Sequence, residues 1–243
     1  MTGSRLAYTL LMIAAASVAT WFVSRRQRSL SLKASDRWTI LASGFVGATF
    51  SAKAPFLLFG QLGGPLWAPW LGDGKTILWG LAGGYLGVEV GKYMVGVRVR
   101  TGDTFVVGIT LAIAIGRIGC LLFGCCYGLP TSMPWGICFV TAEDGGMVPR
   151  HPTQIYESLF HLCFAGVAAV GIQRRWLVGD WMPVYLIGYC VYRFVSEWVR
   201  PEARIAMGLT FYQLSALVIA AAMTMVLLHR HRRSLPTPQA SVD

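Results

Sequence analysis

Residues 104–126 read TFVVGITLAIAIGRIGCLLFGCC, a stretch in which Arg117 is the one charged side chain. A run of roughly 17 to 25 apolar residues is long enough to cross the hydrocarbon core of a bilayer as a helix. The whole chain has a matching composition, because 55% of its 243 residues are hydrophobic and only 13% are charged. Soluble domains carry about 25% charged residues, so the sequence predicts an integral membrane protein.

Six further apolar runs of similar length flank this stretch. Together they predict an all-α membrane protein with seven transmembrane helices, at about 7–23, 39–60, 76–97, 104–126, 155–173, 177–198 and 208–228. The first run is predicted to be a helix and not a signal peptide, because its arginines follow the apolar residues. We expect one seven-helix transmembrane domain over residues 1–233 and a disordered cytoplasmic tail over 234–243.

The 21 Lys and Arg residues predict the orientation of these helices. Thirteen fall in links that an outside N-terminus would place in the cytoplasm, and five fall in the opposite links. Cytoplasmic loops hold the excess of positive charge, so we expect the N-terminus outside and the C-terminus in the cytoplasm. The longest link, about 127–154, then forms a small outer lobe. This topology accounts for the net charge of +10, and no nucleic-acid partner is predicted.

Three other patterns are not interpreted as binding or catalytic sites. The Gly-Lys-Thr triplet at 74–76 lacks the earlier glycine of a phosphate-binding nucleotide loop, because position 69 is Pro. The six cysteines contain no Cys-x-x-Cys pair, so we interpret Cys120, Cys125 and Cys126 as small buried thiols and predict no metal and no cofactor. Glycines at 83, 87 and 91 form a small-residue face that is typical of helix packing.

Charged residues inside the apolar runs are the first candidates for a site, since a charge near the bilayer centre costs at least about 2.5–3.5 kcal/mol. These residues are Lys53, Glu89, Arg117, Arg193 and Glu197. Gly116, Gly119 and Gly128 surround Arg117 in the sequence and would let a ligand approach its guanidinium group. The alternative is an arginine whose side chain reaches the outer headgroups.

A second arginine lies on the sixth predicted helix. Tyr189, Arg193 and Glu197 are spaced four residues apart, so they share one face of this helix. A structural ion pair between Arg193 and Glu197 is the simpler interpretation. One carboxylate cannot neutralise both membrane arginines, however, and a pair of guanidinium groups suits a phosphate group.

The segment 151–157, His-Pro-Thr-Gln-Ile-Tyr-Glu, connects the predicted outer lobe to the fifth helix. It is explained as a plain helix start by its proline and early carboxylate. His151 is also a group in this region that titrates near neutrality, so it is a candidate proton acceptor. These residues together predict a cationic, glycine-lined site that opens toward the outer leaflet and binds an anionic lipid.

Three motifs resemble the prolipoprotein diacylglyceryl transferase family. Gly116-Arg117-Ile118-Gly119 with Gly124, Tyr127 and Gly128 is similar to the family signature, and residues 150–157 resemble its Arg-His-Pro-Ser-Gln-Leu-Tyr-Glu motif. Residues 189–197 resemble its Tyr-x-x-x-Arg-x-x-x-Glu helix, with Arg200 after it. The resemblance covers about residues 40 to 220. It implies a bacterial inner-membrane, multi-pass enzyme that moves a diacylglyceryl group from phosphatidylglycerol to the lipobox cysteine thiol of a preprolipoprotein.

The resemblance also implies roles for individual residues. Arg117 and Arg193 would bind the lipid phosphate, Glu197 and Tyr189 would orient Arg193, and His151 is the candidate base. The expected substrate-binding or gate residues of second rank are Lys53, Asp103, Gly116, Gly119, Gly128, Tyr156, Glu157 and Arg200.

The chain departs from the family pattern at two places. The usual His-Gly-Gly-Leu motif reads Ala-Gly-Gly-Tyr at 82–85, so a family histidine is missing. In the signature, Cys120, Phe123 and Cys125 replace two Asn and one Glu. Three alternatives therefore stay open at this point: a related lipid-transfer enzyme with another acceptor, a carrier that binds anionic lipid without catalysis, and a thiol-redox protein that uses Cys125 and Cys126.

Overall fold

The computed structural model describes residues 2–59 and 76–234, and most of these residues are helical. The α-helices of the described part are α1 (Thr2–Gln27), α2 (Ala34–Phe59), α4 (Ile77–Met94), α5 (Gly102–Phe123), α6 (Thr153–Gln173), α7 (Trp181–Ser196) and α8 (Phe211–Ser234). Between α7 and α8 lie a 3₁₀ turn, η1 (Glu197–Val199), and an antiparallel hairpin of β1 (Arg204–Ala206) and β2 (Leu209–Thr210). The prediction of a mostly helical protein is confirmed. Of the predicted disordered tail, 234–243, the first residue ends helix α8, and the rest lies outside the described residues, as does the last residue of the second predicted span.

Four of the described helices are long and apolar enough to cross a membrane, judged by length and composition. They are α1, α5, α6 and α8. Helix α7 is shorter than its predicted span, 177–198, because the chain turns before it. Leu177 and Gly179 both have positive φ values, of 48° and 82°, so the regular helix begins only at Trp181.

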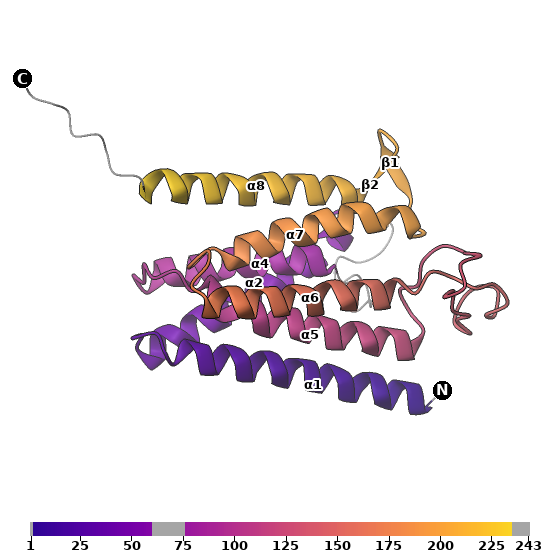
Figure 1. The fold of residues 1–243 in the computed structure, drawn as a ribbon, viewed down its shortest axis with the longest axis horizontal. Helices are drawn as coiled ribbons and strands as arrows, with labels where there is room; N and C mark the ends of the chain where they lie inside the picture. Colours follow the sequence, from indigo (N-terminus) through magenta and orange to yellow (C-terminus); the bar gives the residue numbers. More distant parts are fainter. Residues whose placement is uncertain (1, 60–75, 235–243) are drawn as a thin grey trace, which may run out of the picture.

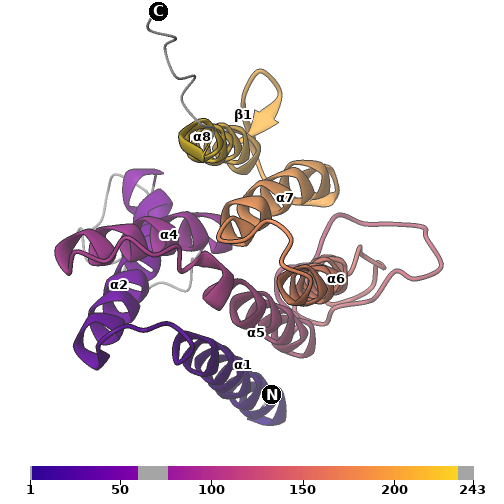
Figure 2. The same ribbon diagram turned by 60° about the vertical axis from the view of Figure 1, so that its left-hand side comes forward.

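The helices lie side by side along one axis, as Figure 1 shows. Helix α5 packs against α1 on one side and α6 on the other, α2 pairs with α4, and α7 pairs with α8. The view in Figure 2 separates these pairs, with α2 and α4 away from α6. The main hydrophobic core lies where α4, α5 and α7 meet, around Leu78, Val106, Tyr185 and Leu186.

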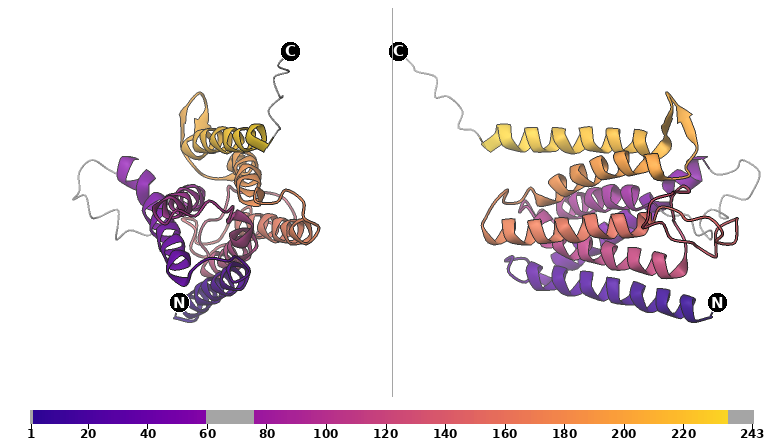
Figure 3. Two further views of the ribbon diagram at one scale, coloured as in Figure 1. Left: turned by 90° about the vertical axis from the view of Figure 1, so that its left-hand side faces the viewer. Right: turned by 45° about the vertical axis from the view of Figure 1, so that its right-hand side comes forward.

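The long link between α5 and α6 and the β1–β2 hairpin lie at the same end of the bundle. Figures 1 and 3 show the start of α1, the long link between α5 and α6, and the β1–β2 hairpin at this end, while α8 finishes at the other. The link is held together locally, since Arg150 pairs with Asp144 at 3.1 Å and forms isolated bridges with Pro130 and Ile137. The backbone N–H of Gly146 and the Arg150 side chain keep the pKa of Asp144 below its usual value. A small lobe is therefore present where the sequence predicted one.

Helices α2 and α4 approach closely because glycines line their contact. A Cβ atom added to Gly83 would collide with the side chain of Ser51, and one added to Gly87 would collide with the carbonyl of Ser43. The prediction that this glycine face serves helix packing is confirmed.

Candidate active site

Glu157 of α6 is the centre of the buried polar cluster. Its side chain is 0% exposed, and three donors from different elements reach its carboxylate. Arg117 of α5 donates to Oε1 at 2.9 Å, and Arg200, which follows η1, donates to Oε2 at 2.8 Å. The hydroxyl of Tyr189 on α7 donates to Oε1 at 2.6 Å. Glu157 therefore ties α5, α6 and the end of α7 together.

A second ion pair lies beside this one. Arg193 Nη2 is 3.0 Å from Glu197 Oε2, so the pair expected from the four-residue spacing is present. The Arg193 guanidinium group also lies over the ring of Tyr212, with its carbon 4.7 Å from the ring centroid. Thr210 donates to the other carboxylate oxygen at 3.1 Å. Tyr189 was expected to orient Arg193. In the structure its hydroxyl donates to Glu157 instead.

The arginine that shares a carboxylate with Arg117 is Arg200, not Arg193. Arg200 was expected only as a residue of second rank. Arg193 still interacts electrostatically with Arg117 and Glu157, so the three guanidinium groups belong to one cluster. Three arginines and two glutamates, all buried, give this cluster a net charge of +1.

Several polar atoms of the cluster have no hydrogen-bond partner within the described residues. One of them is an acceptor, Oε2 of Glu197, which lies 3.0 Å from Arg193 Nη2. The others are Nε of Arg117, Nε of Arg200, Nε2 of His161 and the hydroxyl of Tyr192. Buried polar groups are nearly always hydrogen-bonded in folded proteins, so the unpartnered ones of the cluster are available to water or to a ligand. Apart from Glu197 Oε2, these atoms can donate, and the excess charge is positive, so the arrangement fits an anion.

His161 is a member of the cluster that the sequence analysis did not identify. Its ring is fully buried, Nδ1 shares a hydrogen bond of 3.0 Å with the Tyr185 hydroxyl, and Nε2 lies 3.9 Å from Glu157 Oε1. The signal was present in the sequence, because His161 follows Glu157 by four residues and so shares its helix face.

His151 lies at the edge of the cluster in a different setting. Its Nδ1 is 3.2 Å from the Tyr156 hydroxyl, which also accepts a hydrogen bond of 2.8 Å from Trp135. These three side chains line a cavity of about 400 Å³ together with Tyr192, Val195, Ser196 and Val199. His151 thus borders open space, whereas His161 is enclosed.

Four predicted site residues fix a turn, face another helix or lie buried in their own helix in this structure. Asp103 accepts hydrogen bonds from the backbone N–H groups of Gly179 at 2.6 Å and Trp181 at 3.2 Å, so it fixes the turn before α7. Gly116 and Gly119 face Met12 of α1.

The fourth, Lys53, is buried in α2. Gly128 is different, since it packs against His151, Thr153 and Val199 where the lobe meets the site. Glu89 is another charged residue of the apolar runs, and the sequence did not identify its partner. In the structure it pairs with Lys92 at 3.0 Å and Arg230 at 3.5 Å.

A larger apolar cavity of about 510 Å³ lies between α1, α2, α4 and α5. Its wall is formed mainly by aliphatic and aromatic side chains, among them Val23, Phe45, Leu81, Phe105 and Ile113. Ile113 is one helical turn before Arg117, so this cavity begins near the cationic cluster and continues along α5.

Comparisons with known proteins agree with the motifs. The family model described as prolipoprotein diacylglyceryl transferase matches residues 5–229. Among similar proteins, phosphatidylglycerol–prolipoprotein diacylglyceryl transferase 2 of Clostridium perfringens is 36% identical over 151 residues, which cover 57% of this chain and 55% of that protein. The enzyme of Cupriavidus metallidurans is 32% identical over 212 residues, covering 79% of this chain and 75% of its own length. That of Idiomarina loihiensis is 26% identical over 245 residues, covering 95% and 90%. The chain belongs to the prolipoprotein diacylglyceryl transferase family.

Proposed function

We propose that this protein transfers a diacylglyceryl group from phosphatidylglycerol to the lipobox cysteine thiol of preprolipoproteins in the bacterial inner membrane. The observation that carries the proposal is the buried cluster with a net charge of +1 and unpartnered donors. A phosphodiester carries one negative charge, so it would balance the cluster and accept its free hydrogen bonds. The names of the similar transferases indicate the acceptor, a prolipoprotein, and the reaction type.

The reaction is a substitution at carbon. The sulfur of the acceptor thiolate attacks the carbon of the diacylated glycerol that is bonded to the phosphate oxygen. A C–S bond forms, and the bond between that carbon and the phosphate oxygen breaks. The glycerol phosphate leaves with the bonding electrons, so negative charge grows on the phosphate as the bond breaks. Arg117, Arg193 and Arg200 are in place to stabilise that charge, an effect worth about 2.7–4 kcal/mol for one well-placed donor in other enzymes.

Glu157 and Tyr189 are positioning residues in this proposal. Glu157 holds Arg117 and Arg200 together through hydrogen bonds of 2.9 and 2.8 Å, and Tyr189 fixes the same carboxylate. Glu197 does the same for Arg193. Guanidinium groups held in this way keep their remaining N–H groups aimed at one place before substrate arrives, which lowers the cost of organising them in the transition state.

His151 is the base in this proposal, because an incoming thiol must reach the group that takes its proton. His151 borders the cavity of about 400 Å³, next to Tyr156 and Ser196. His161 is fully buried behind Glu157 and is held by Tyr185, so it supports the carboxylate. Replacing each histidine by Asn separates the two roles. His151→Asn should lower kcat and remove the fall of kcat toward acidic pH, where a base is protonated and cannot accept the thiol proton, whereas His161→Asn should lower kcat and leave that fall in place.

The proposed topology has seven spans, with the N-terminus and the lobe outside and the C-terminus in the cytoplasm. The start of α1 and the lobe lie at the same end of the bundle and the end of α8 lies at the other, which supports this arrangement. The site is then near the outer surface. The apolar cavity of about 510 Å³ continues from it toward the cytoplasmic side and would hold part of the acyl chains.

The test is an assay of the purified protein with phosphatidylglycerol vesicles and a lipobox peptide. Mass spectrometry should detect the peptide with a thioether-linked diacylglyceryl group, and Arg117→Ala should abolish the product. Binding of phosphatidylglycerol without product would support a carrier and contradict the proposal. Full activity of Arg117→Ala would contradict the role of the cluster.

A further inference from the structure

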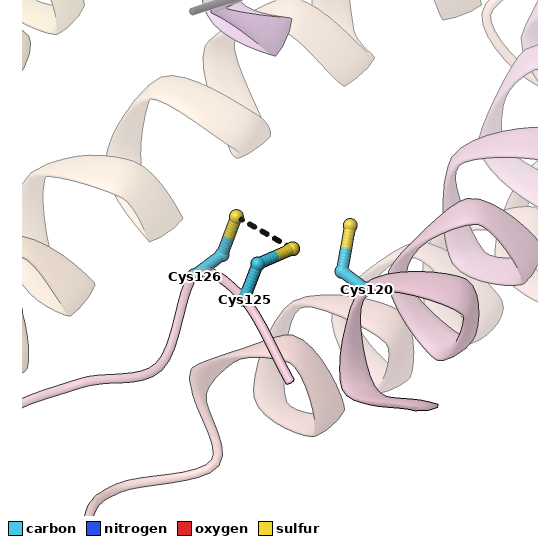
Figure 4. A group of neighbouring side chains, drawn as sticks. All are labelled: Cys120, Cys125 and Cys126. Atoms are coloured by element: carbon cyan, nitrogen blue, oxygen red, sulfur yellow. Dashed lines mark hydrogen bonds between the residues drawn. The ribbon is translucent and has the colours of Figure 1, made fainter. Parts of the chain in front are cut away.

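Three cysteines gather at the end of α5, beside the arginine cluster. The Sγ atoms of Cys120, Cys125 and Cys126 all lie within 4.8 Å of one another. Figure 4 shows the three sulfur atoms pointing to the same side, Cys120 from the last turn of the helix and the other two from the loop after it. All three are free thiols. The expectation of buried thiols is wrong for Cys126, which is exposed, while Cys120 and Cys125 are partly exposed.

The backbone explains how these residues meet without a Cys-x-x-Cys motif. Helix α5 ends at Phe123, and Gly124 adopts a left-handed conformation with a φ of 81°. Its N–H bonds the carbonyl of Cys120 at 3.0 Å, and the N–H of Cys125 bonds the same carbonyl at 3.1 Å. This helix cap folds the loop back over the last turn of α5. Cys120 is thereby brought next to Cys125 and Cys126, which follow it by five and six positions.

The loop is also held from outside. Thr153 donates to the carbonyl of Cys126 at 2.6 Å, and Gln154 donates to that of Cys125 at 2.5 Å. Cys126 itself has a φ of 64°, a left-handed conformation that residues with a Cβ atom adopt rarely. Such a conformation persists where the surroundings impose it, and it is most frequent at functional sites.

We infer that Cys120, Cys125 and Cys126 form a three-thiolate binding site for a soft, thiophilic metal ion of the d¹⁰ class. Thiolate ligands select ions such as Cu⁺, Zn²⁺ and Cd²⁺ over hard ions such as Mg²⁺. With a metal–sulfur distance of about 2.3 Å, sulfur ligands lie about 3.8–4.0 Å apart in tetrahedral or trigonal coordination. The Cys125 and Cys126 sulfurs are 3.5 Å apart, and the third is close enough that sub-ångström to ångström shifts complete the site.

The positive charge of nearby arginines favours the binding of a metal ion by three thiolates. Arg117 interacts electrostatically with Cys120 and Cys126, and Arg200 interacts with Cys126. Three thiolates and a divalent ion carry one negative charge in total, which is of the sign that these guanidinium groups favour. The partial exposure of the thiols leaves a path by which an ion can enter.

The first experiment titrates Cd²⁺ into the reduced full-length protein in detergent without oxygen. The thiolate-to-metal charge-transfer absorption should rise and saturate at one ion per chain, and Mg²⁺ should have no effect. Cys120→Ser, Cys125→Ser and Cys126→Ser should each weaken Cd²⁺ binding by at least about 100-fold. The control is Cys163→Ser on α6, an exposed thiol outside the cluster, which should bind Cd²⁺ as the unchanged protein does.

A second measurement needs no variant, so it is independent of any folding defect. One equivalent of Cd²⁺ should protect Cys120, Cys125 and Cys126 together from alkylation by N-ethylmaleimide, with Cys163 modified as before. Absorption that rises without saturation, binding unchanged in Cys120→Ser, or protection of fewer than the three cysteines would overturn the inference. Both readouts are independent of transferase activity, so they do not depend on the proposed reaction.

Discussion

Glu157→Gln removes the carboxylate that Arg117 and Arg200 share and keeps the shape of the side chain. The net charge of the buried five-residue cluster rises from +1 to +2. In the unchanged protein three donors bond the two carboxylate oxygens of Glu157. Glutamine offers these donors a single acceptor oxygen. Removing one partner from a buried ion pair costs about 3–5 kcal/mol, because the remaining charge is left uncompensated.

The free energy of unfolding should therefore fall by about 3–5 kcal/mol, which lowers the Tm of a chain of this size by about 6–20 °C. Thermal unfolding of the purified variant in detergent measures the shift, and the transferase assay should detect no product. Glu89→Gln is the matched control, since Glu89 also pairs with two cations, but it lies in the last two turns of α4 and its side chain is 37% exposed. Solvent screening should keep its cost below about 1 kcal/mol.

A double variant separates charge from shape. Glu157→Gln with Arg200→Gln removes one negative and one positive charge, so the net charge returns to +1. It should recover part of the lost Tm and none of the activity, because one phosphate-binding arginine is gone. The reasoning would be refuted by a Glu157→Gln protein that melts within about 2 °C of the unchanged one, or by a double variant less stable than Glu157→Gln.

Four further outcomes are expected. Arg117→Lys keeps the charge but loses the planar fork, so kcat should fall about 10²–10³-fold with little change in Tm. Gly87→Leu forces α2 and α4 apart and should cost about 1–3 kcal/mol in thermal unfolding. Asp103→Asn weakens the turn before α7, so it should cost about 0.5–2 kcal/mol while KM for phosphatidylglycerol stays unchanged. The pKa of Asp144 is lower in the folded protein, so its stabilising effect is present above the unfolded pKa and is lost as the pH falls below about 4. The protection factors of residues 137–150, which correct for the slower intrinsic hydrogen exchange in acid, should then fall, and Asp144→Asn should remove that pH dependence.

The helices could be predicted from the sequence because hydropathy is a local property. Each apolar run corresponds to an α-helix of the structure, and the polar link between α5 and α6 is the lobe. The start of α7 was predicted four residues too early, since a run that is apolar does not reveal left-handed residues such as Leu177. Gly179 and Asp180 were the sequence signal for this turn, because glycine adopts positive φ readily and Asp is favoured just before a helix, but the hydropathy of the run outweighed them.

The pairing inside the site could not be predicted in the same way. The ion pair between Arg193 and Glu197 is four residues apart and was expected. The contacts of Glu157 with Arg117 and Arg200 span 40 and 43 residues, so they depend on how three helices pack. Local spacing therefore did not predict the partners: it joined Arg117 to Arg193, gave Arg200 only the second rank and did not identify His161.

Helix α5 shows why the signature can diverge at one position without loss of the fold. Gly116 and Gly119 lie on the face that packs against α1, whereas Arg117 faces Glu157. Cys120 follows Arg117 by three residues and so lies on the same side as the arginine. A change from Asn to Cys at this position alters the chemistry beside the guanidinium group and leaves the contact with α1 untouched. The two faces of one short segment thus separate helix packing from the site, which allows a thiol cluster to form next to Arg117, the arginine that we propose binds phosphate.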